Sequence, residues 1–145
     1  MNQTTNFNID ARITETCFDL GNWPLSRVFL KNNAHYPWFI LVPREEGAQD
    51  ITELSQTARH LLIDEVSQLS SLLKEYFKPD KLNVGSLGNI VSQLHLHVVG
   101  RFSHDLLWPH GVWQLAQTSV PYTEEQLQPL WTFLKSHGLS LQQPG

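Results

Sequence analysis

Apolar residues along the chain recur at helical spacing in one long stretch and form short β-rich runs on both sides of it. Between residues 51 and 77 they are three and four positions apart, which is the spacing of one face of an α-helix. Asp50 with Glu53 three residues later resembles a capping box, and Pro79 follows the last apolar position. The pattern predicts one long amphipathic helix that begins at Asp50 and is stopped by Pro79.

Shorter β-rich runs lie on both sides of this helix. Residues 27–31 and 38–43 precede it, and residues 82–85 and 93–102 follow it. The first two runs are expected to pair as antiparallel neighbours. Residues 7–20 mix apolar and polar side chains without a clean period, so this stretch is expected to be irregular.

A second helical pattern lies near the end of the chain. Thr123 and Gln126 form a capping signature, the apolar positions that follow share one helical face, and Gly138 stands where a helix would end. The interior Pro129 is expected to kink or delay this helix. The element order predicts a single α+β domain over residues 1–145, with a mainly antiparallel sheet, one long helix and one C-terminal helix.

Composition narrows the classes of partner. The chain has 145 residues and a formal net charge of -4, which provides no electrostatic footprint for long nucleic acid or an anionic membrane. The single cysteine, Cys17, cannot form an internal disulfide and indicates a reducing compartment. The N-terminus has no signal-peptide pattern, and no stretch approaches the ~18 apolar residues of a membrane span. A cytoplasmic protein is expected.

Residues 88–101 carry the candidate chemistry. Alternate side chains of a strand share a face, so Gln93, His95 and His97 are predicted to point together, opposite to Leu94 and Leu96. Neutral imidazole is a good nucleophile because its ordinary pKa is ~6.5, and a hydrogen bond to one ring nitrogen selects the attacking tautomer. His95 is therefore predicted to attack phosphorus, while His97 contacts a phosphate oxygen or assists the leaving group.

The loop before this strand offers neutral donors to phosphate from Asn89 and Ser92, and its small residues allow close approach. A metal site is the competing interpretation, because His-x-His on a strand also begins the metal sites of cupin barrels. Those sites need a nearby acid, and the next acidic residue after His97 is Asp105. Neither helix carries a His-Glu-x-x-His pattern. The sequence favours phosphate chemistry without a metal or a redox cofactor.

Residues 93–99, QLHLHVV, resemble the signature of the histidine triad (HIT) family of nucleotide hydrolases and transferases, His-x-His-x-His followed by two apolar residues. The likeness covers about residues 25–113. Asn83 with the following Gly-Ser resembles the family's asparagine-containing strand and loop, and residues 38–44 resemble its earlier strand ending in Pro and a basic residue. Gln93 replaces the first histidine and cannot become a cation. Trp38 lies near a position that is often histidine in the family and helps hold the nucleophile.

The resemblance implies a role for each matching residue. His95 matches the middle histidine, which forms the covalent nucleotidyl intermediate, and His97 matches the third, which contacts phosphate. Gln93 matches the first, which orients the site. Phosphate or ribose contacts are implied for Asn83, Asn89, Asn32 and Asn33, and Phe29, Leu30 and Trp38 are expected to flank a base.

The function implied is hydrolysis, or as a second choice transfer, at the α-phosphorus of a nucleoside phosphate derivative such as a phosphoramidate or a dinucleoside polyphosphate. A homodimer with a sheet that continues across the subunits is also implied. The alternative is a nucleotide-binding or interaction protein of the same fold that has lost turnover through the changes at Gln93 and Trp38.

Several other polar and aromatic residues are expected to have ordinary roles. Of the five histidines outside the motif, His35, His104 and His110 are expected to be exposed, and His60 to pack or lie at the surface of the long helix. Arg44 and Arg101 at strand ends are expected to be solvated or paired at the surface rather than to bind phosphate. Trp108 and Trp113 are expected to pack in the core, or else to cap a base or a neighbouring subunit.

Overall fold

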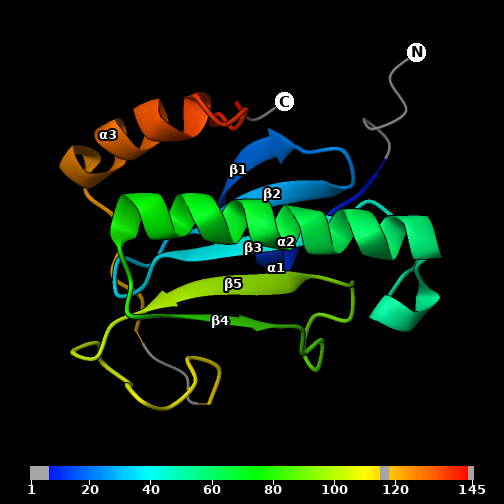
Figure 1. Cartoon of the computed structure of the whole chain (residues 1–145), viewed down its shortest axis with the longest axis horizontal. Coiled ribbons are helices and arrows are strands. Elements are labelled where there is room, and N and C mark those ends of the chain that lie inside the picture. The colour runs from blue at the N-terminus through cyan, green and yellow to red at the C-terminus, as the bar shows by residue number, and fades with distance from the viewer. Residues whose placement is uncertain (1–6, 115–117, 144–145) are drawn as a thin grey trace.

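The computed structural model describes residues 7–114 and 118–143. Its centre is a five-stranded sheet in the order β1-β2-β3-β5-β4, with every neighbouring pair antiparallel (Figure 1). The strands are β1 (Cys17–Asn22), β2 (Ser26–Lys31), β3 (Trp38–Pro43), β4 (Lys81–Gly85) and β5 (Leu96–Arg101). Helices α2 (Gln56–Phe77) and α3 (Glu124–Lys135) pack on one face, and the short α1 (Ala11–Thr14) lies on the other. The predicted α+β class is confirmed.

The expectation that residues 7–20 are irregular is wrong, because α1 and β1 fall within them. The Asp10 side chain caps α1 by accepting a hydrogen bond from the Arg12 N–H at 2.9 Å. β1 pairs with β2 along its length, but its register shifts between Asp19 and Asn22. β1 is also an edge strand with only two adjacent positions buried. The alternation that would have revealed it is therefore missing.

The predicted long helix begins later than expected. Asp50 and Glu53 belong to a separate 3-10 turn, η2 (Ile51–Glu53), in which the Glu53 carboxylate accepts from the Asp50 N–H at 3.0 Å. α2 has its own N-cap, Ser55, whose hydroxyl accepts from the Ala58 N–H at 3.1 Å. Two consecutive capping signals thus divide one apolar pattern into two elements.

The other helix boundaries agree with the sequence pattern. α2 ends at Phe77, two residues before Pro79. Thr123 and Gln126 exchange hydrogen bonds at the start of α3, and Pro129 is accommodated inside this helix. Close packing brings the end of α2 against β5 at Gly100, where a Cβ atom would lie 2.8 Å from Leu73 Cδ2.

Apolar side chains fill both faces of the sheet. Leu94 and Leu96 pack toward α2, whereas Trp38, Ile40 and Val99 belong to a cluster on the opposite face. The predicted alternation therefore holds through this segment, although β5 itself begins only at Leu96 rather than at residue 93. The cluster that contains Trp38, Ile40 and Val99 lies beneath the candidate site.

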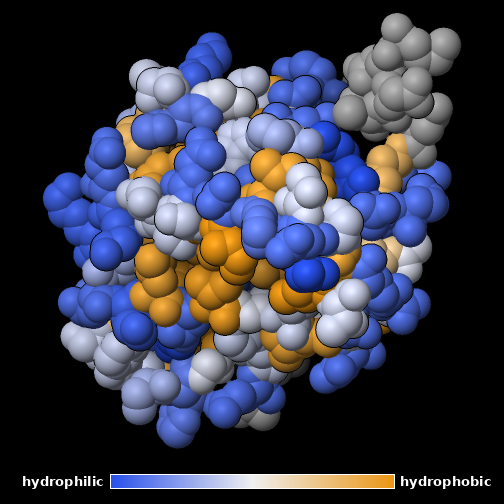
Figure 2. Space-filling model, turned by 45° about the vertical axis from the view of Figure 1, so that its right-hand side comes forward, coloured by the Kyte–Doolittle hydropathy of each residue, from blue (hydrophilic) through white to orange (hydrophobic). Residues whose placement is uncertain are grey.

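Hydrophilic side chains make up much of the surface, and apolar side chains are exposed between them on the face in view (Figure 2). Val84 on the edge strand β4 is 45% exposed, and Leu87 and Ile90 in the following loop are 46% and 81% exposed. Within the described ranges, no helix is long and apolar enough to cross a bilayer.

Candidate active site

A pocket of about 410 Å³ lies on the sheet face that carries α1, and it contains both histidines of the motif. Segments far apart in the sequence form its wall: α1 and the residues after it, the last residue of β2, the middle of β3, the start of β5 with the loop before it, and the loop before α3. Its lining residues are Arg12, Ile13, Thr16, Lys31, Ile40, Leu87, Gly88, Asn89, Ile90, Val91, His95, His97 and Trp113.

His95 stands immediately before β5 and is 7% exposed. Its Nδ1 lies 2.7 Å from the backbone carbonyl oxygen of Gln93. A carbonyl oxygen can only accept, so this contact assigns the proton to Nδ1 in the neutral ring. The lone pair on Nε2 is then available for nucleophilic attack.

His97 has the opposite tautomer. Its Nδ1 accepts a hydrogen bond from the Trp38 indole N–H at 2.9 Å, and an indole nitrogen can only donate. The neutral ring therefore carries its proton on Nε2. Burial, with smaller contributions from charge repulsion by His95 and Lys31, lowers the pKa of His97 to about 3. His97 is thus a neutral N–H donor near pH 7, with its ring 4.9 Å from that of His95.

The sequence comparison suggested that Trp38 stands where a family residue supports the nucleophile. In the structure Trp38 binds His97 instead, and its indole packs edge-on against Trp113 at 6.4 Å between ring centroids. The Lys31 ammonium lies 5.2 Å from the centroid of the Trp38 ring. The indole of Trp38 therefore connects the third motif position to a cation at the pocket wall.

The low pKa of His97 predicts a pH dependence of stability. Between pH 6.5 and about 3 the unfolded chain binds a proton at this residue and the folded chain does not. The free energy of unfolding is therefore expected to fall as the pH falls through this window, by up to about 1.4 kcal/mol per pH unit from His97. Urea unfolding of wild type and His97→Asn across the window measures the contribution. Equal slopes in the two proteins would contradict it.

Of the predicted site residues, His95, His97 and Asn89 line the pocket. Gln93 does not: its side chain points to the N-terminal segment, where it binds the backbone of Asn8 and Asp10. Ser92 and Gln93 line a separate small cavity together with Asn8 and Asp10. The expectation that Gln93 shares the polar face of both histidines is therefore wrong for its side chain.

The other three asparagines of the predicted site do not line this pocket, and each accepts a hydrogen bond elsewhere in the fold. Asn83 Oδ1 accepts from Arg101 at 2.8 Å. Asn33 Oδ1 accepts from the His35 N–H at 3.1 Å. Asn32 Oδ1 accepts from the Tyr122 N–H at 2.9 Å. Asn32 does line an adjoining cavity of about 450 Å³, which shares Thr16 and Lys31 with the first pocket.

None of the three residues predicted to flank a base, Phe29, Leu30 and Trp38, is among the residues that line the pocket. Phe29 and Leu30 are fully buried and do not line the pocket. Trp113 provides an aromatic wall instead, 5.5 Å from His97 between ring centroids, and its buried indole N–H has no hydrogen-bond partner among the described residues. Its position next to the motif depends on the path of the loop before α3, so the sequence contained no local signal for it.

Arg12, Ile13 and Lys31 are among the further pocket residues that the sequence did not predict. Arg12 and Ile13 come from the segment that was expected to be irregular, and Lys31 ends a strand. The signal that could have found Arg12 was Asp10 before it, a capping residue two positions away. No local pattern marks Lys31 as a pocket residue.

The surface role expected for Arg101 is also wrong. Arg101 is 1% exposed and forms a buried ion pair with Asp105 at 2.9 Å. Arg44 donates to the backbone carbonyls of Trp23 and Pro24.

Among residues 7–114 and 118–143, no group of three or more His, Cys, Asp or Glu side chains is arranged to hold a metal ion.

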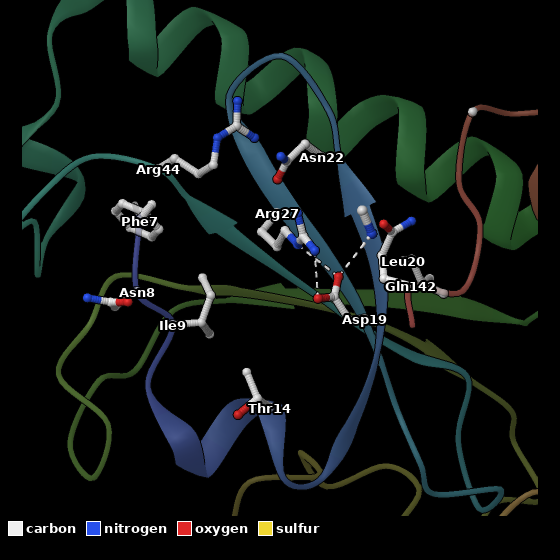
Figure 3. Close-up of a pocket in the computed structure, with 12 residues that line it drawn as sticks. Phe7, Asn8, Ile9, Thr14, Asp19, Leu20, Asn22, Arg27, Arg44 and Gln142 are labelled. Atoms are coloured by element: carbon white, nitrogen blue, oxygen red, sulfur yellow. Dashed lines mark hydrogen bonds and ion pairs between the residues drawn. The ribbon is translucent and has the colours of Figure 1, made fainter. Parts of the chain in front are cut away.

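A larger cavity, of about 660 Å³, lies beside β1 and β2 (Figure 3). Its lining contains neither histidine of the motif, and the Asp19–Arg27 ion pair at 2.7 Å lies within it. The N-terminal segment contributes Phe7, Asn8 and Ile9 to this cavity. The same segment contributes Arg12 and Ile13 to the histidine pocket, so it takes part in both.

Comparisons with known proteins agree with this geometry. The family model described as "HIT domain" matches residues 15–104, whereas no curated protein matches the chain. A histidine triad protein from Marinobacter aquaeolei is 42% identical, with a TM-score of 0.84 over 90% of this chain and 94% of its own. One from Bradyrhizobium japonicum is 37% identical, with a TM-score of 0.85 over 90% and 96% of the two chains. One from Sinorhizobium meliloti is 32% identical, with a TM-score of 0.85 over 91% and 97%.

Proposed function

Because the chain belongs to the histidine triad (HIT) family, we propose that it is a hydrolase acting on the α-phosphorus of a nucleoside phosphate derivative. Family membership implies nucleotide hydrolase or transferase activity. The proposed substrate is a phosphoramidate or a dinucleoside polyphosphate. The observation that carries the proposal is the pair of opposite tautomers, in which His95 offers a lone pair on Nε2 and His97 offers an N–H donor.

In the proposed reaction, His95 Nε2 attacks the α-phosphorus and forms a P–N bond as the bond to the leaving group breaks. The leaving group departs as a phosphate, or takes up one proton and departs as an amine or an alcohol, and the proton that water loses in the second step balances this uptake. Water then attacks the same phosphorus, the P–N bond breaks, and nucleoside monophosphate is released while His95 is regenerated. His97 Nε2–H is proposed to donate to a phosphate oxygen throughout, because His97 remains neutral near pH 7.

The charges around the pocket support an anionic substrate. No acidic side chain is among the described residues that line the pocket. Lys31 lies in the wall against Trp38 and makes no ion pair with a described carboxylate. Asn89 and Gly88 lie in the loop that reaches the same pocket, where an amide side chain and a residue without a Cβ suit phosphate oxygens.

A second candidate is a nucleotide-binding or interaction protein with little or no turnover. The orientation of Gln93 favours it, since the residue that matches the first histidine turns its side chain toward the N-terminal segment and away from the pocket. Both candidates predict nucleotide binding. Only the hydrolase predicts a covalent intermediate.

The test is to supply the wild-type protein with a fluorogenic adenosine phosphoramidate and, in parallel, a dinucleoside polyphosphate. Turnover of either one, together with an acid-labile adenylyl adduct located on His95 by mass spectrometry after a rapid alkaline quench, is the expected result. Nucleotide binding without turnover or adduct would overturn the hydrolase and support the binding protein. The relative rates on the two substrates identify the leaving group.

We further propose a homodimer in which the sheet continues across the subunits. β4 is an outer strand of the sheet, and exposed Val84 and Leu87 lie on it and after it. Light scattering is expected to give twice the mass of one chain, and the mass of a single chain would contradict the proposal.

We also propose a cytoplasmic location, which the single half-buried thiol of Cys17 supports.

A further inference from the structure

Gln93 makes two kinds of contact at once. Its side-chain Oε1 accepts from the Asp10 N–H at 2.8 Å, and its Nε2 donates to the Asn8 carbonyl at 2.8 Å. Its own backbone carbonyl accepts from Nδ1–H of His95 at 2.7 Å. One residue therefore joins the N-terminal segment to the ring that we assign as the nucleophile.

We propose that residues 8–13 are a positioning element of the active site and that Gln93 is the positioning residue through which they act on His95. By fixing Gln93, the segment holds the carbonyl that selects the His95 tautomer and orients its ring. The catalytic part of this inference rests on the proposed hydrolase function, whereas the effect on the His95 ring does not.

The same segment has a second attachment to the loop between β4 and β5. Arg12 Nη1 donates to the Ile90 carbonyl at 3.0 Å, and the Asp10 carboxylate binds the Arg12 guanidinium at 2.8 Å. The hydrogen bonds from Arg12 lower the pKa of Asp10 to about 2, so this ion pair is charged near neutral pH. Ile13 anchors the segment in the core at 3% exposure. The loop is thus held at Ile90 and again at Gln93.

The chemistry of the carboxamide explains why glutamine suits this position. Asn8 and Asp10 present an acceptor and a donor two residues apart on one side of the chain, and an amide offers its donor and acceptor side by side, as a neighbouring strand would. The two nitrogens of an imidazole point in divergent directions and cannot match both groups. The family match begins at residue 15, so residues 8–13 lie outside it.

Three variants test the inference: Gln93→Ala, Gln93→His, and Gln128→Ala as a matched control. Gln128 is an exposed glutamine on α3 whose amide also makes a side-chain hydrogen bond, to Glu124 at 3.0 Å. The first readout is the His95 tautomer, measured by long-range ¹H–¹⁵N spectra. Wild type and Gln128→Ala are expected to show the proton on Nδ1, and Gln93→Ala a mixture with Nε2–H. An unchanged tautomer in Gln93→Ala would overturn the inference, even if the wild-type protein hydrolyses nothing.

The second readout separates kcat from KM on the best substrate. Gln93→Ala is expected to lower kcat roughly tenfold with a much smaller change in KM, since the ring that attacks is misoriented while the pocket remains. Gln93→His is expected to behave like Gln93→Ala. If this variant, which contains all three histidines, matched or exceeded wild type in kcat, the positioning role would be overturned in favour of a direct role for the first motif residue.

A further variant tests the inference if neither Gln93→Ala nor Gln93→His gives a folded protein. Arg12 has an exposed side chain, so Arg12→Gln should leave the fold intact while removing the bond to Ile90. It is expected to raise the hydrogen-exchange rate of the amides of residues 8–13 and to lower kcat in the same direction. Unchanged exchange and unchanged kcat would contradict the positioning element.

Discussion

His95→Ala is expected to reduce kcat/KM by about four orders of magnitude or more, on a phosphoramidate and on a dinucleoside polyphosphate alike. Removal of a covalent nucleophile leaves no group that can form the intermediate, and losses of this size follow such changes in other enzymes. His97 cannot replace it, because Trp38 binds its Nδ1 and its Nε2 carries the proton. Steady-state kinetics of the purified variant measure the effect.

The control for this experiment is His60→Ala, since His60 is an exposed histidine on α2, the helix that packs on the opposite face of the sheet. His95→Ala should retain cooperative unfolding and should still bind adenosine monophosphate, because most of the pocket wall is formed by other residues. A variant as active as wild type would disprove the mechanism. A folded but inactive variant that binds nucleotide would support it.

Asp105→Ala is expected to lower the free energy of unfolding by about 3–5 kcal/mol. The Asp105 carboxylate accepts from Arg101 Nε and Nη2 at 2.9 and 3.0 Å and from two backbone N–H groups, those of Phe102 and Trp108. The side chains of Arg101 and Asp105 are only 2% and 3% exposed. Removing the carboxylate leaves a buried guanidinium without its counter-charge, which is the costly way to break an ion pair.

The matched control is Asp19→Ala, which breaks an ion pair of similar geometry with Arg27 at 2.7 Å. The side chains of that pair are 25% and 33% exposed, so solvent compensates for much of the loss, and about 1 kcal/mol is expected. Urea unfolding of both variants measures the difference. Equal losses would show that burial of the Arg101–Asp105 pair has little effect on stability.

The sequence pattern predicted the elements whose buried face gives the apolar residues a regular spacing along the chain. α2 has one apolar face against the sheet, so its period is visible in the residues, and Pro79 marks its end. β2 and β3 are rich in buried β-branched and aromatic residues for the same reason. β1 escaped detection because an edge strand with a register shift buries too little to show a period. The start of α2 was misplaced because two capping signals follow each other.

In the candidate site, too, the sequence predicted some features and the tertiary structure alone decided others. Alternation along residues 94–99 placed His95 and His97 on one face of the sheet, a consequence of strand geometry that needs no knowledge of the rest of the fold. The tautomers of both rings, the burial of Arg101 and the presence of Arg12, Lys31 and Trp113 in the site depend on contacts between segments far apart in the chain. Only the tertiary structure decides such contacts, because the direction of a side chain such as that of Gln93 depends on which distant backbone groups remain to be satisfied.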